Sequence, residues 1–328
     1  MEVVFLDTVF FTSSDGYINK KLINYFLDKG YKVAALGCGD GITDPRCTFS
    51  NIDIVNSSDD VKSFVFKMKP TIFIHSAFTV DCDLSAEIPD NIVKDSAKVD
   101  SWLFPFLTVQ DIKRVICLST SFLYGIRGGM GPGMEHDIIT SYNNCTAIKY
   151  NMEMAMHRAV KNSKRNEAFA ALRVSPVYGK DYLNNLIPLV YDEKTEAYFK
   201  FGTVSYNFSL CHINNLLELT FNYATRESVD EFESMDMSII PVNVCDASVV
   251  EVNEIITGLK KVFKEAPALL ISPASTKLSA AKGLLNRKEK RINTNYIDAA
   301  VATSNHRCNT SIALLICTLR WSFKDILQ

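Results

Sequence analysis

The chain has 328 residues, enough for one large domain or two smaller ones, and 47% hydrophobic and 22% charged residues are typical of a globular protein. Its net charge of −2 gives no basic surface that would attract DNA, RNA or an anionic membrane, so we expect no nucleic-acid partner. The most apolar late stretch, residues 311–319, is too short to span a bilayer, and the N-terminus lacks the basic lead of a signal peptide. These features predict a cytoplasmic protein without a membrane span.

The cysteines and histidines give no sign of a metal centre or a disulfide framework. The nine cysteines are scattered singly, without a Cys-x-x-Cys pair, which predicts a reducing compartment and mostly buried thiols. The five histidines show no metal-ligand spacing, so we expect no metal.

Strand-like and helix-like segments alternate along the first half of the chain. The predicted strands are residues 8–12, 31–37, 51–55, 71–77, 113–120 and 168–174. The predicted helices are residues 17–30, 61–69, 91–109 and 146–162. This alternation predicts an α/β fold with a doubly wound, mostly parallel, Rossmann-like sheet, whose ligands lie at the carboxyl ends of the strands.

Beyond about residue 180 the alternation loosens, and the clearest helices are residues 211–227 and 249–265. We therefore predict a Rossmann-like dinucleotide-binding domain over residues 1–180. A smaller mixed α/β substrate region over residues 181–328 would complete the same structural unit.

A glycine-rich stretch at residues 37–41 resembles the first motif of S-adenosylmethionine-dependent methyltransferases. A loop of that type needs a helix directly after its glycines. Here Pro45 interrupts the following segment and the next strand is predicted about ten residues on, which leaves no room for a useful helix. We interpret residues 37–41 as a plain connection between two strands.

Seven segments, taken in order, resemble the extended short-chain dehydrogenases/reductases. They are residues 8–33, 51–61, 71–78, 113–125, 145–155, 171–180 and 210–224. Within this group the 3β-hydroxysteroid dehydrogenase and nucleotide-sugar epimerase/dehydratase branches are the most similar. The resemblance implies hydride transfer between a nicotinamide cofactor and a CH–OH or ketone group.

The resemblance also implies catalytic residues, with one departure. Thr120 matches the family's Ser/Thr position and Lys149 matches its lysine, but Cys145 stands where the family has its catalytic tyrosine. A thiol beside a lysine can ionise, although it lacks the reach of a phenol. The alternatives are that Tyr142 substitutes for the tyrosine, or that Cys145 is simply a small buried residue.

The cofactor side departs from the family as well. Residues that the resemblance places at NAD or NADP are Ser13, Gly16, Tyr17, Ile18, Asp53, Ile54, Ser76, Ala77, Lys149 and Pro176. Ser13 and Asn19 replace two of three loop glycines, and a positive φ at Ser13 would be costly. Gly37 replaces the acidic residue that holds the ribose in NAD-binding members, and Arg46 is the first basic residue available for NADP. These departures predict weakened or lost cofactor binding.

Two functions remain open. In the first, the chain is an NAD(P)-dependent oxidoreductase acting on a steroid-like or nucleotide-sugar small molecule. In the second, it is a catalytically inactive member that serves as a binding or regulatory subunit. The resemblance also implies a homodimer formed through the helices predicted at residues 91–109 and 145–162.

Overall fold

The computed structural model describes residues 7–39, 41–78, 88–125, 131–141, 143–161, 163, 169–193, 195–227, 239–271 and 307–326. Its centre is a seven-stranded sheet in the order β12-β6-β5-β4-β1-β2-β3, in which every neighbouring pair is parallel. The strands are β1 (Thr8–Phe11), β2 (Lys32–Leu36), β3 (Cys47–Ser50), β4 (Ile72–His75), β5 (Arg114–Thr120), β6 (Phe169–Val174) and β12 (Ile240–Val244). The predicted doubly wound α/β fold is confirmed.

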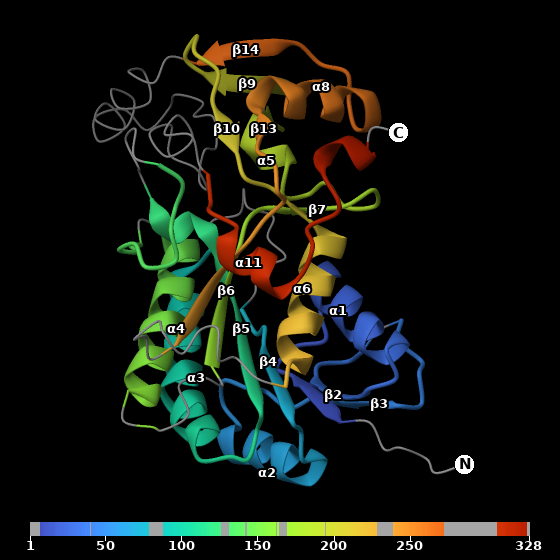
Figure 1. The fold of residues 1–328 in the computed structure, drawn as a ribbon, viewed down its shortest axis with the longest axis vertical. Helices are drawn as coiled ribbons and strands as arrows, with labels where there is room; N and C mark the ends of the chain where they lie inside the picture. The colour runs from blue at the N-terminus through green and yellow to red at the C-terminus, as the bar shows by residue number, and fades with distance from the viewer. Residues whose placement is uncertain are drawn as a thin grey trace.

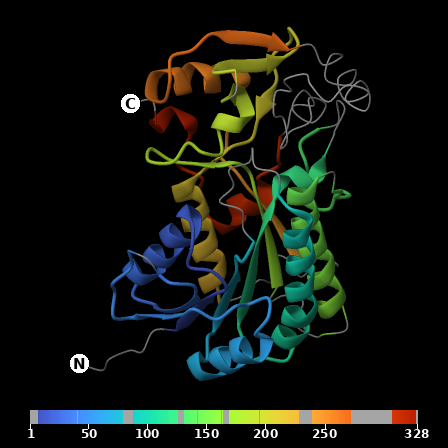
Figure 2. The ribbon, with the colours of Figure 1, turned by 180° about the vertical axis from the view of Figure 1, so that it is seen from behind.

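Helices cover both faces of this sheet (Figures 1 and 2). One apolar core joins the sheet to α1 (Tyr17–Asp28), α6 (Ile213–Thr225) and α11 (Ser311–Ile316). A second core, on the other face, joins it to α2 (Ser58–Met68), α3 (Asp90–Thr108) and α4 (Asn144–Val160). In β1, Val9 and Phe11 point into the first core and Phe10 into the second, as the two-residue period of a strand requires.

The third strand lies earlier in the chain than predicted. It spans Cys47–Ser50 and not residues 51–55, and Leu36 at the end of β2 pairs with Ser50. Thr48 and Ser50 are polar and only Cys47 and Phe49 pack against the first core, so this edge strand lacks the continuous apolar run of a buried strand. Ile52 and Ile54 suggested a strand because they are apolar, but they lie in a turn and pack against the second core.

The connection from β2 to β3 contains no helix in its described residues, 37–39 and 41–46. The interpretation of the glycine-rich stretch as a strand-to-strand connection is therefore confirmed.

A smaller assembly lies beyond the carboxyl ends of the central strands (Figure 1). It contains the sheet of β8 (Tyr191–Asp192), β9 (Ala197–Phe201) and β14 (Ala268–Ile271), the pair β10 (Asn207–Phe208) with β13 (Val250–Glu251), and the helices α5 (Ile187–Val190) and α8 (Val252–Val262). Two further kinds of element complete the described structure. β7 (Val177–Tyr178) pairs with β11 (Cys211–His212), and there are two 3₁₀ turns, η1 (Ser121–Tyr124) and η3 (Phe323–Ile326). A third apolar core fills this assembly.

The chain crosses more than once between the two parts, because β12 and α6, from the second half of the sequence, belong to the central sheet and its first core. The division at residue 180 stays a prediction. Within the described residues, no helix combines the length and apolar character that crossing a membrane requires.

Candidate active site

Helix α4 runs antiparallel to β5 and places its first turns at the carboxyl edge, the side of the sheet where the strands end. The Ser119 hydroxyl donates to Glu153 Oε1 at 2.5 Å, and Cys117 Sγ lies 3.5 Å from Met156 Sδ. Lys149 is one turn before Glu153, about 6 Å along the helix axis. This spacing brings Lys149 level with the end of β5, where Thr120 lies.

Lys149 and Thr120 are both buried there, with 5% and 9% of their surfaces exposed. The Thr120 hydroxyl accepts a hydrogen bond from the Phe122 amide at 3.3 Å and so caps η1. The structure thus brings two of the predicted catalytic residues to one edge of the sheet.

Cys145 lies one further turn toward the start of α4. It is half-buried and packs against the third apolar core, the one that fills the smaller assembly. It therefore stands where the central sheet and the smaller assembly meet. Tyr142, the predicted substitute for the missing tyrosine, lies outside the described residues.

A buried ion pair anchors α4 to the sheet. Arg173, on β6, contacts Glu153 with Nη2 at 2.8 Å, and the two side chains are 5% and 1% exposed. Arg173 Nη1 also donates to the Tyr124 hydroxyl at 3.0 Å, and that hydroxyl donates to Asn243 Oδ1 at 2.6 Å. Burial raises the pKa of Tyr124 well above its usual value, which makes this phenol a poor replacement for the missing proton donor.

The loop between β1 and α1 is held at the same edge. The Thr12 hydroxyl accepts hydrogen bonds from the amides of Ser76 and Ala77, each at 2.8 Å. Since its oxygen accepts twice, its own hydrogen points to His75 Nδ1, 3.1 Å away. His75 Nε2 then donates to Asp100 Oδ1 at 3.2 Å. This chain of buried contacts ties the ends of β1 and β4 to α3.

Position 16 is the place in this loop where the backbone conformation favours a glycine. It precedes α1 with φ +81°, and no side chain caps the helix. The first backbone amides of α1 are therefore suited to binding an anionic group. Ser13 does not adopt a positive φ, so the predicted strain at that position is absent. Asn19, which replaces another glycine, is buried and donates from Nδ2 to the Asp15 carbonyl at 2.8 Å.

Close approaches explain the glycines after β2. A Cβ at Gly37 would lie 2.3 Å from Ser14 Oγ, and one at Gly39 would lie 2.4 Å from the Phe49 ring. Both residues also have positive φ, at +113° and +67°. These glycines allow tight packing between neighbouring strand ends.

Asp53 and Ile54 lie in the turn that leads from β3 to α2. The Asp53 carboxylate accepts hydrogen bonds from the Val55 amide at 2.9 Å and from Asn56 Nδ2 at 2.7 Å. These bonds lower the pKa of Asp53. The carboxylate thus shapes the turn that opens α2.

Tyr17 and Ile18 begin α1, and their side chains point to different surroundings. Ile18 is buried in the first core, so only its backbone can face a ligand. Tyr17 stacks on Tyr182 with ring centroids 4.1 Å apart, and its hydroxyl donates to Asp181 at 2.6 Å. These contacts join the start of α1 to the segment after β7.

Ser76 directly follows β4 and Pro176 lies two residues after β6, so both lie at the carboxyl edge. Ser76 is buried and its hydroxyl has no hydrogen-bond partner in the described part of the chain. The Pro176 carbonyl accepts a hydrogen bond from the Cys211 amide at 3.0 Å.

A family model described as the NAD dependent epimerase/dehydratase family matches residues 12–233. The chain belongs to this family. No curated protein gave a match. Solved structures with the same fold include UDP-glucose 4-epimerase from Thermotoga maritima, at 14% identity over 98% of this chain and 96% of that one, with a TM-score of 0.70.

Two further epimerase/dehydratase structures share the fold. UDP-glucuronic acid 4-epimerase from Bacillus cereus, solved with UDP-glucuronic acid and NAD, is 16% identical over 98% of this chain and 96% of that one, with a TM-score of 0.69. The dTDP-glucose 4,6-dehydratase from Bacillus anthracis, solved with NAD, is 15% identical over 98% of this chain and 94% of that one, with a TM-score of 0.66.

Sequence reasoning missed a second buried polar cluster of this epimerase/dehydratase chain, centred on Asp246 just after β12. Its carboxylate accepts hydrogen bonds from the Tyr178 hydroxyl at 2.5 Å, the His212 amide at 2.8 Å and Asn215 Nδ2 at 2.8 Å. Asn215 also donates to the Trp321 carbonyl at 2.9 Å. The cluster therefore joins β7, β12 and the C-terminal segment, which no local sequence pattern connects.

Burial raises the pKa of Asp246 to about 6, although its three hydrogen bonds oppose the shift. A raised pKa in the folded state means that folding favours the protonated carboxyl, so stability falls as pH rises from about 4 to 6. The shift corresponds to about 3 kcal/mol of stability.

We expect the Asp246→Asn variant, which has no such carboxyl, to lack this decrease in the free energy of unfolding, measured by urea unfolding from pH 4 to 7. The exposed control Asp60→Asn should keep it, and an unchanged slope in Asp246→Asn would contradict the assignment.

Proposed function

We propose that this protein binds NAD(H) at the carboxyl edge of the central sheet and acts on a CH–OH or ketone group of a nucleotide sugar. The observation that carries the proposal is that two polar side chains are buried toward the carboxyl edge: Thr120 at the end of β5, and Lys149 on the helix that the Glu153–Arg173 ion pair anchors. The relatives solved with UDP-glucuronic acid and NAD support a nucleotide sugar in preference to a steroid.

The residues present fit a dinucleotide. Gly16 leaves the first amides of α1 without a side-chain cap, and these amides suit a pyrophosphate. In this proposal Asp53, in the turn after β3, lies near the adenine, as the family resemblance implies. In this proposal Lys149 holds the nicotinamide ribose.

Arg46 supports NAD over NADP. Its guanidinium contacts the Asp44 carboxylate at 3.0 Å through Nε and at 2.5 Å through Nη2. A basic side chain that is already paired with a carboxylate is a weaker partner for the 2′-phosphate of NADP.

When bound, NAD supplies the hydride acceptor. The chain's own residues would then orient the substrate and manage its proton. The Thr120 hydroxyl would hold the substrate oxygen. The positive charge of Lys149 would lower the pKa of a neighbouring acidic group and so favour loss of its proton. Cys145 occupies the position of the proton donor, with a shorter reach than a phenol.

One observation favours the alternative of a catalytically inactive binding subunit. Cys145 packs against apolar side chains of the third core, an environment typical of a structural thiol. In this alternative, the protein keeps the fold, has lost the reaction, and serves as a binding or regulatory subunit.

Titration of the purified protein with NAD, NADH, NADP and NADPH by calorimetry tests cofactor binding. We expect micromolar binding of NAD or NADH and weaker binding of the NADP forms. The Lys149→Met variant should bind about tenfold more weakly, because one charge-assisted contact is lost. Lys161→Met, at the far end of the same helix, is the matched control. Folded protein that binds none of the four cofactors would refute the proposal.

The proposal also includes a homodimer formed through α3 and α4, which lie side by side on one face of the sheet (Figure 2). Light scattering would then give about twice the chain mass of 36.8 kDa. The eight described cysteines are free thiols, in keeping with the predicted cytoplasmic location.

A further inference from the structure

Position 37 cannot supply the carboxylate that NAD-binding Rossmann folds place at the end of the second strand. Gly37 has φ +113°, where a side chain is strained, and a Cβ there would lie 2.3 Å from Ser14 Oγ. The glycine is therefore required by the packing of the neighbouring loop. An acidic residue could not simply be restored at this position.

A different residue brings a carboxylate to the same place. The two oxygens of Asp15 lie 3.3 and 3.4 Å from the point where a Cβ on Gly37 would stand. A side chain rooted at position 37 would carry its own carboxylate into this neighbourhood. Asp15 reaches the same place from the loop that follows β1, the strand that pairs with β2.

The residues that replace the family's glycines hold Asp15 in position. The Asp15 amide donates to Ser13 Oγ at 3.2 Å, and its carbonyl accepts from Asn19 Nδ2 at 2.8 Å. Between them, the Ser14 amide donates to the Leu36 carbonyl at 2.7 Å, which ties this loop to the end of β2. Ser13 and Asn19 thus support the loop conformation that presents Asp15.

The Asp15 side chain is exposed, and within the described part of the chain it forms no ion pair. Its Oδ1 accepts a long hydrogen bond from the Ser14 hydroxyl at 3.5 Å, and the carboxylate keeps further accepting capacity for a ligand. A carboxylate at this edge can accept hydrogen bonds from the two hydroxyls of a ribose, and it repels a 2′-phosphate.

We propose that Asp15 holds the adenosine ribose of the bound dinucleotide and sets the preference for NAD over NADP. The loss of the acid at position 37 and the gain of Asp15, Ser13 and Asn19 are then one coupled change, in which the carboxylate has moved from the strand end to the loop. This inference rests on the proposed binding of NAD.

The test is calorimetric titration of NAD and NADP into the natural protein, Asp15→Ala and Asp15→Asn. Removing a charged acceptor should weaken NAD binding about 10- to 100-fold in Asp15→Ala. Asp15→Asn keeps one acceptor oxygen, so its affinity for NAD should lie between those of Asp15→Ala and the natural protein. NADP binding should stay unchanged or tighten in both variants, so the ratio of the two dissociation constants should fall.

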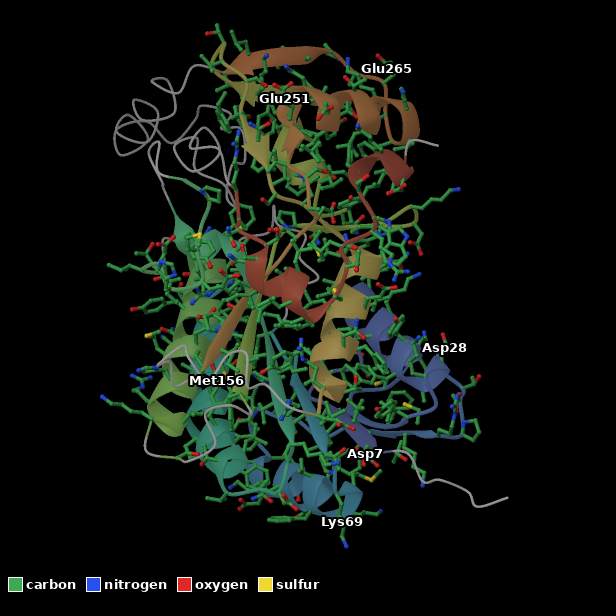
Figure 3. All side chains as sticks on the ribbon, viewed as in Figure 1. Asp7, Asp28, Lys69, Met156, Glu251 and Glu265 are labelled. Carbon is green, nitrogen blue, oxygen red and sulfur yellow. The ribbon has the colours of Figure 1, made fainter. Side chains whose placement is uncertain are left out.

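Asp28→Asn is the matched control, because it removes an acidic charge from the last residue of α1, at the end far from Asp15; Asp28 is labelled in Figure 3. It should change neither dissociation constant. If Asp15→Ala changes NAD and NADP binding by the same factor, or tightens both, the carboxylate faces the pyrophosphate and the inference is wrong. If the natural protein binds neither cofactor, the proposed function itself fails. Circular dichroism of each variant confirms that it is folded.

Discussion

The Cys145→Tyr variant is expected to turn over a nucleotide-sugar substrate with NAD(H) about 10²- to 10⁴-fold faster than the natural protein, which is the usual contribution of a positioned acid or base. Position 145 is four residues before Lys149, so both side chains lie on the same face of α4. A phenol there would extend from the helix toward the end of β5 and have Lys149 beside it. The increase should appear mainly in kcat, because proton transfer occurs in the chemical step.

The matched control is Cys145→Phe, which has the same ring without the hydroxyl. It accounts for overpacking in this half-buried position, which costs about 1–3 kcal/mol of stability. The gain in Cys145→Tyr should vanish when Lys149→Met is added. Equal rates in Cys145→Tyr and Cys145→Phe, in protein that binds NAD, would favour the inactive binding subunit.

Arg173→Met is expected to lower the free energy of unfolding by about 3–5 kcal/mol, because Glu153 would remain buried without its partner. The Glu153 side chain is 1% exposed, so solvent cannot replace the guanidinium. The substitution should also remove the hydrogen bond from the guanidinium to the Tyr124 hydroxyl. Urea unfolding at pH 7 measures the change.

The double variant Arg173→Met with Glu153→Gln should recover part of this loss, since no buried charge remains. Lys62→Met is the matched control, because it breaks the exposed ion pair with Asp59 at 2.9 Å. That pair should be worth less than about 1 kcal/mol. A loss of similar size in Arg173→Met and Lys62→Met would show that the buried pair does not anchor α4.

The order of strands and helices follows from local patterns that the sequence carries in full. Helix α1 has buried residues at Ile18, Leu22 and Phe26, a spacing of four that puts them on one face. The first four residues of β6, 169–172, are all apolar and buried, as expected for a strand covered on both faces. Such signals depend on neighbours within a few residues, so they are visible without the structure.

The edge strand β3 was missed because its residues carry no such local signal. Thr48 is exposed and Cys47 half-buried, so the strand carries no continuous apolar run. Only pairing with β2 identifies it, and that pairing depends on residues 14 positions apart, such as Val33 with Cys47. Backbone hydrogen bonds between strands leave little trace in the side-chain pattern of an edge.

The sequence by itself determined the α/β class, the family resemblance and the candidates Thr120, Lys149 and Cys145, because each depends on residue types at short, regular spacings. Only the tertiary structure decided that Asp15 reaches the space beside Gly37, that Arg173 pairs with Glu153, and that Asp246 joins three distant segments. The contacts of Arg173 with Glu153 and of Asp246 with Tyr178 join residues 20 and 68 positions apart, and the contact of Asn215 with Trp321 in the Asp246 cluster spans 106 positions. Which of them meet depends on strand order and on how each helix packs across the sheet, and both are properties of the whole fold.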